Sequence, residues 1–173
     1  MPSTYDVARC WAGFALLGAG LIHLAVVREH LAESALHGAF FVVVGAGQLG
    51  VALVAVARGR MPAPGIVVAA QLGVVALWAA SRTTGLPVGP QPWAPEPVGT
   101  ADVLAVSLEL LAVAAVLVLT LPARRRLGTA VRPARWLAMV GAGALVVASL
   151  TTPALASTEA GEHAKEHGSS HHH

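Results

Sequence analysis

The sequence predicts an all-α membrane protein, a bundle of five transmembrane helices with a Pro/Gly-rich loop between the third and fourth. Of its 173 residues, 55% are hydrophobic and only 12% are charged, which is too apolar for a water-soluble domain. A spanning helix needs about 20 mostly apolar residues, and five stretches meet this length without the alternating polar face of a soluble helix. They run from Cys10 to Val27, Leu36 to Ala57, Pro64 to Ser81, Asp102 to Leu121 and Trp136 to Leu155.

The composition changes from apolar to polar after residue 156, so we divide the chain into a helical bundle, residues 1–156, and a C-terminal tail, residues 157–173. The tail has the polar composition of a disordered segment, and its last residues, GSSHHH, resemble the remnant of an expression tag. Cys10 is the single cysteine, so no internal disulfide can form. No second folded domain is expected.

The basic residues predict an orientation. Eight of the eleven, all arginines, lie in the N-terminal segment and in the loops after the second and fourth spans. Arg28, Arg82 and Lys165 lie on the other side. By the positive-inside rule the N-terminus is cytoplasmic and the C-terminus is outside. Because arginine, alanine and valine are abundant, we expect a bacterial cytoplasmic (inner) membrane.

Local signals predict how the helices begin, pack and end. Leu21–Ala32 contains no helix breaker, so we place the reversal near His30–Ser34, with Ser34 as an N-cap. In the second span, Gly45, Gly47 and Gly50 are expected to allow close helix approach. The third helix is expected to begin at Pro64, a favourable first-turn residue.

The stretch Thr83–Thr100 interrupts this pattern. Five prolines and three glycines in eighteen residues exclude a helix. It is either an extended, solvated linker or, as its apolar side chains and Trp93 favour, a rigid segment on the membrane surface or over the bundle mouth.

The few ionisable groups within the spans indicate a site. His23 lies seven residues before His30, and Glu109 seven residues after Asp102, so both are expected about 10 Å below the outer interface. A carboxylate in hydrocarbon costs about 2.5–3.5 kcal/mol, so Glu109 must be protonated, paired, metal-bound or hydrated. The candidate metal ligands, which we expect to line one outward-facing cleft, are His23, His30, His37, Asp102 and Glu109.

Imidazole and carboxylate ligands suit Zn, Cu, Fe or Mn, so the leading hypothesis is a transition-metal site used for metal handling or metal-dependent chemistry in the membrane. Several alternatives use the same groups. His23 and His37 could be axial ligands of haem b. Glu109 could join a structural network with Gln48 or Gln71, or the groups could serve proton-linked transport.

The sequence also limits the functional classes. It contains no P-loop, G-x-S-x-G, C-x-x-C or H-E-x-x-H motif, and no nucleophile–base pair, so an enzyme is less expected than a binding protein. A non-catalytic subunit that packs on a membrane partner, or on a second copy of itself, is the remaining alternative. We expect contact with the lipid bilayer and none with nucleic acid.

Overall fold

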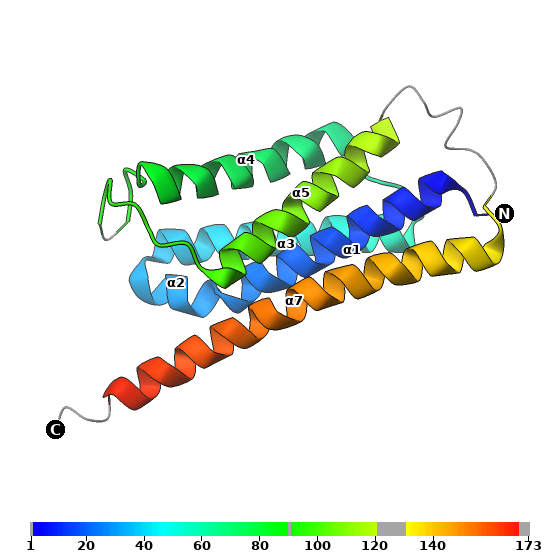
Figure 1. Ribbon diagram of the computed structural model, residues 1–173. Helices are drawn as coiled ribbons and strands as arrows, with labels where there is room; N and C mark the ends of the chain where they lie inside the picture. Colours follow the sequence, from blue (N-terminus) through cyan, green and yellow to red (C-terminus); the bar gives the residue numbers. More distant parts are fainter. Residues whose placement is uncertain (1, 90, 121–130, 170–173) are drawn as a thin grey trace.

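The computed structural model describes residues 2–89, 91–120 and 131–169, with side chains up to residue 156. Within these ranges the chain is all helical, without a β-sheet (Figure 1). The helices are α1 (Thr4–Ala25), α2 (Val27–Glu33), α3 (Ala35–Ala57), α4 (Pro64–Thr83), α5 (Thr100–Thr120) and α7 (Pro133–Ser169).

Five of these helices are long and apolar enough to cross a membrane, namely α1, α3, α4, α5 and the segment Pro133–Ala156 of α7. The prediction of a multi-pass helical membrane protein is therefore confirmed by the length and composition of the helices. The spans occur where the sequence places them, although α1 begins six residues before the expected Cys10. Helix α7 continues to Ser169, past the expected end of the bundle at residue 156. The disorder of the tail stays a prediction, since its side chains and residues 170–173 lie outside the described part.

Helix α1 forms the centre of the bundle and packs against α3, α5 and α7. Its buried face is rich in small residues, and Ala12, Ala15, Leu16 and Ala19 are completely buried. The helix begins with a capping box, in which the Ser3 hydroxyl and the Asp6 carboxylate satisfy each other's backbone amides. Helix α4 lies at the edge, packed on α5 and not closely on α3.

The chain between α1 and α3 reverses in two steps. Helix α1 ends at Ala25, and Val26, which keeps right-handed helical angles, redirects the chain into the short helix α2. Ser34 then occupies the predicted N-cap position of α3, but its hydroxyl makes no capping hydrogen bond. The break at Val26 was not expected, because none of the residues around it is a helix breaker.

Gly20 of α1 and Gly45 of α3 allow these helices to approach closely. A Cβ added to Gly45 would lie 2.9 Å from Leu24 and 3.1 Å from the Gly20 carbonyl oxygen, so a larger residue does not fit. The same role was expected of Gly47 and Gly50, and this part of the prediction is wrong. Apart from the adjoining backbone of α3 itself, a Cβ at either position meets no atom of the described residues within 4 Å.

This difference predicts opposite outcomes for two matched substitutions. Gly45→Val should destabilise the bundle by about 1–3 kcal/mol, because it forces α1 and α3 apart. Gly47→Val should change stability little, because no neighbouring helix among the described residues lies near the new side chain. Both substitutions alter intrinsic helix propensity equally, so the difference between them reports the helix contact. Reversible unfolding in mixed micelles measures both, and an equal loss for the two variants would contradict the assigned helix contact.

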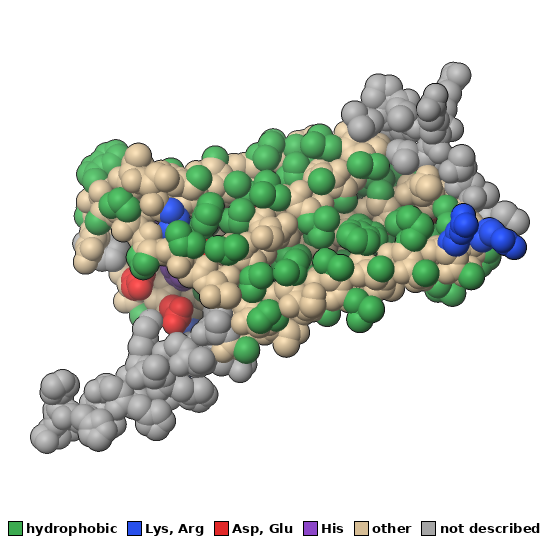
Figure 2. Space-filling model, in the orientation of Figure 1, with side chains coloured by type: hydrophobic (Ala, Val, Ile, Leu, Met, Phe, Trp, Pro, Cys, Tyr) green, Lys and Arg blue, Asp and Glu red, His purple; other side chains and the backbone are tan. Residues whose placement is uncertain are grey.

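The two ends of the bundle differ in charge, whereas its visible flank is covered by hydrophobic side chains (Figure 2). Basic side chains gather at the end that holds the N-terminus. Acidic side chains and histidine appear, beside some basic atoms, at the opposite end, which is formed by α2 and residues 84–89 and 91–99. We call this second end the loop end. A cavity enters the bundle there.

Candidate functional site

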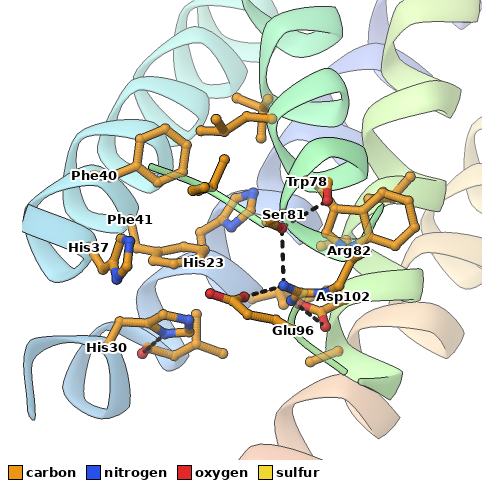
Figure 3. A pocket seen from close by; sticks show the side chains of 18 of the residues that line it. His23, His30, His37, Phe40, Phe41, Trp78, Ser81, Arg82, Glu96 and Asp102 are labelled. Atoms are coloured by element: carbon orange, nitrogen blue, oxygen red, sulfur yellow. Dashed lines mark hydrogen bonds and ion pairs between the residues drawn. The ribbon is translucent and has the colours of Figure 1, made fainter. Parts of the chain in front are cut away.

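The cavity lies between α3 and α4 and has a volume of about 380 Å³. Helices α1 and α5 form its back wall, and the loop between α4 and α5 contributes Leu86, Pro87 and Val88. Phe40 and Phe41 of α3 face Trp78 of α4 across it (Figure 3). The walls are therefore mainly apolar and aromatic, as in most small-molecule sites.

Four buried polar side chains form a continuous network at the inner end. His23 Nε2 of α1 lies 2.9 Å from Glu109 Oε1 of α5. Gln48 Nε2 of α3 donates to the same Glu109 oxygen at 3.2 Å and to Gln71 Oε1 of α4 at 2.9 Å. These residues are between 1% and 6% exposed, so the network joins four helices inside the bundle.

The network leaves two acceptor atoms unused. Glu109 Oε2 and Gln48 Oε1 are buried and have no hydrogen-bond partner among the described residues. An unpaired polar atom inside a membrane protein costs several kcal/mol, because hydrocarbon offers no replacement partner. An unexplained buried acceptor beside a cavity therefore indicates a ligand, an ion or a bound water.

Ion pairs fasten the loop over the cavity mouth. Arg82, in the last turn of α4, donates to Glu96 of the loop and to Asp102 of α5, the latter at 2.8 Å. The Glu96 backbone amide also donates to the Ser81 carbonyl oxygen at 3.0 Å. At Gly89, where φ is +109°, a Cβ would lie 2.6 Å from the His37 ring. The loop is thus a structured cover over the mouth, one of the two alternatives left open by its composition.

Outside the mouth the cavity continues into a wider and more polar hollow of about 710 Å³. We call this hollow the vestibule. The two spaces share His30, His37 and Arg82 among their lining residues. The vestibule is lined by four carboxylates, those of Glu29, Glu33, Glu96 and Asp102, against the single guanidinium of Arg82. It is therefore an acidic entrance to an apolar cavity.

All five predicted site residues line the inner cavity, so they share one cleft. Only His23 and Glu109 bond to each other. His30 Nδ1 bonds to the Val26 carbonyl oxygen at 2.9 Å, and Asp102 pairs with Arg82. Within the described ranges, no three histidine, cysteine or acidic side chains are grouped closely enough to hold a metal ion. Metal binding accordingly stays a prediction.

Sequence reasoning missed the aromatic walls. Phe40, Phe41 and Trp78 are not among the site residues that the sequence predicts. A signal was present in the helical spacing, because Gln71 and Trp78 are seven residues apart, as are Phe41 and Gln48. Two turns of helix place each pair on one face, with the aromatic residue on the loop-end side of the buried amide.

Comparisons with protein-family models, with curated proteins and with solved structures find no match to this chain. The class of multi-pass membrane protein therefore rests on the helices themselves.

Proposed function

We propose that this membrane protein binds a small, largely apolar molecule with a polar head, in the cavity between α3 and α4. The single observation that carries the proposal is the aromatic cavity that ends on the buried His23–Glu109 pair, where one carboxylate oxygen lacks a partner. Such a cavity with a few convergent polar groups is the usual form of a small-molecule site.

The position of the cavity supports entry from the bilayer. Leu36 of α3 and Leu77 of α4 line the cavity and are 60% and 38% exposed, so the cavity wall is open at these two helices. The wall between α3 and α4 is thin there, since α3 packs on α1 and α2 whereas α4 packs on α5. A molecule dissolved in the membrane could pass between these helices, with its polar head reaching Glu109.

A cavity-filling variant tests this proposal. Val106 of α5 lines the cavity, whereas Val103, on the same helix, is 46% exposed and lies outside it. Val106→Trp should weaken binding of the apolar probe 1-naphthylmethanol at least about tenfold, a change of 1.4 kcal/mol. Val103→Trp should bind it like the wild type.

The measurement is isothermal titration of each protein in nanodiscs of zwitterionic lipid, with empty nanodiscs as the blank for partitioning. Equal affinities of the two tryptophan variants would show that the probe dissolves in lipid and does not enter the cavity. The proposal would then be wrong.

A transition-metal site is the second candidate, and the 2.9 Å separation of His23 Nε2 and Glu109 Oε1 favours it. Ligand bonds near 2.0–2.2 Å allow both atoms to contact one ion after small rotations. We expect Zn, Cu, Fe or Mn, with His30, His37 or Asp102 recruited from the same cavity.

Metal analysis of the purified protein, with the tail histidines replaced by alanine, tests the metal site. One equivalent of metal in the wild type should be lost in both His23→Ala and Glu109→Gln. Equal, sub-stoichiometric amounts in all three proteins would count against it.

The same preparation tests haem b, with His23 and His37 as axial ligands, because bound haem gives a visible Soret band.

The orientation is also part of the proposal. Arg58, Arg60, Arg132 and Arg135 lie at the end opposite the loop, which supports a cytoplasmic N-terminus in a bacterial inner membrane. The cavity mouth then faces outward. The exposed apolar side chains on α3 and α4 fit contact with lipid, and a protein partner stays an alternative without a specific contact in its favour.

A further inference from the structure

We infer that the ligand of this cavity is a lipophilic organic cation, a protonated amine on an apolar body, and that Glu109 is its counter-ion. The inference rests on the proposed function and assigns it a substrate class. It follows from three features, namely the atoms left unpaired at the inner end, the aromatic walls and the charge of the vestibule.

The unpaired atoms at the inner end require a donor. Glu109 lines the cavity and is 1% exposed, and its Oε2 accepts hydrogen bonds. Gln48 Oε1, outside the cavity lining, is a second unpaired acceptor in the same network. A protonated amine supplies several N–H donors and a charge, and its hydrogen bonds to a carboxylate are about twice as strong as neutral ones. An anionic head would be repelled by the Glu109 carboxylate. Of the described residues that line the cavity, Arg82 alone carries a guanidinium, and both of its terminal nitrogens are engaged by Glu96 and Asp102, which leaves only Nε without a partner.

The walls favour a cation with an apolar body. Phe40, Phe41 and Trp78 line the path from the mouth to Glu109. Aromatic faces attract cations, most strongly where water is excluded, and tryptophan is the strongest of the three ring types. The same rings bury the hydrocarbon part of the molecule.

The vestibule favours cations at the entrance. Its four carboxylates outnumber the one guanidinium, and His30 and His37 are the other titratable groups that line it. A cleft lined by one sign of charge, with low-dielectric walls, raises the local concentration of the opposite charge. The entrance and the inner end therefore select for the same ligand charge.

Charge balance is kept when such a ligand binds. The groups bonded to Glu109 are His23 of α1 and the neutral amide of Gln48, which in turn donates to Gln71. An ammonium group beside the Glu109 carboxylate cancels its charge, so the bound ligand leaves no isolated charge at the inner end.

Two probes of matched shape test the inference. 1-Naphthylmethylamine is a cation at neutral pH, and 1-naphthylmethanol is its neutral counterpart. Titrated into the full-length protein in zwitterionic nanodiscs, the amine should bind at least about tenfold more tightly than the alcohol. This ratio needs no variant, so it does not depend on the folding of a mutant.

Variants then assign the counter-ion. Glu109→Gln should bring the two affinities within about threefold of each other, with binding of the alcohol retained. Asp6→Asn, the equivalent change in the first turn of α1, alters a carboxylate that lines neither the cavity nor the vestibule, and it should keep the preference for the amine. A preference that survives Glu109→Gln would overturn the role of Glu109.

The remaining outcomes separate the two proposals. Equal binding of amine and alcohol to the wild type would overturn the cation inference and leave the proposed function intact. If neither the amine nor the alcohol binds, both the cation inference and the proposed function are overturned.

Discussion

Replacing His23 by leucine should destabilise the folded bundle by about 3 kcal/mol, the largest effect that we expect of a single substitution. His23 is 6% exposed, and its ring nitrogen lies 2.9 Å from Glu109 Oε1. Without the imidazole, Gln48 is the one partner that Glu109 keeps among the described residues. Removing one member of a buried ion pair leaves the other without a partner, which lowers the folding stability by about 3–5 kcal/mol. Reversible unfolding in mixed micelles measures the loss.

The double substitution sharpens this prediction. When His23→Leu is combined with Glu109→Leu, no charge is stranded, and a buried pair exchanged for apolar residues is often nearly neutral. The double variant should therefore be more stable than either single variant. Additive losses, with no coupling between the two positions, would contradict the assigned interaction.

Arg82→Met should release the loop that covers the cavity. Arg82 holds Glu96 of the loop and Asp102 of α5, and each charge-assisted bond contributes about 1.5–3 kcal/mol when it is shielded from water. Glu96 is 47% exposed, so water screening reduces its share, and we discount the total to about 1.4 kcal/mol. Amide hydrogen exchange at the paired amides of Trp93 and Glu96 should accelerate about tenfold.

Arg58→Met is the control for this prediction, because Arg58 is exposed at the opposite end of the bundle. It should leave exchange in the loop unchanged. Unaltered exchange in Arg82→Met would mean that the backbone bonds alone hold the loop.

Much of the fold could be predicted from composition and length. The sequence predicts the spans because lipid requires about 20 apolar residues per helix. It predicts the loop because the prolines there exclude a helix. The pairing of His23 with Glu109 could also be anticipated. A constant rise per residue puts both at one depth, and a buried carboxylate needs a partner.

The rest depends on how the helices pack, which an apolar sequence barely encodes. In a soluble protein the polar face of a helix marks its outside, but here lipid-facing and buried positions are both apolar. Gly45 and Gly47 therefore look equivalent in sequence, although only Gly45 meets a neighbouring helix. For the same reason the separation of α3 from α4, which creates the cavity, could not be foreseen.

Photolabelling tests the central claim most directly, namely that a membrane-soluble ligand occupies the cavity between α3 and α4. The probe is 4-benzoylbenzylamine, activated in nanodiscs, and labelled peptides are identified by mass spectrometry. We predict labels on the cavity walls, at Phe40, Phe41 and Trp78, that 1-naphthylmethylamine suppresses. Labels confined to the outer surface, such as Leu53 and Ile66, and insensitive to competition would contradict the account.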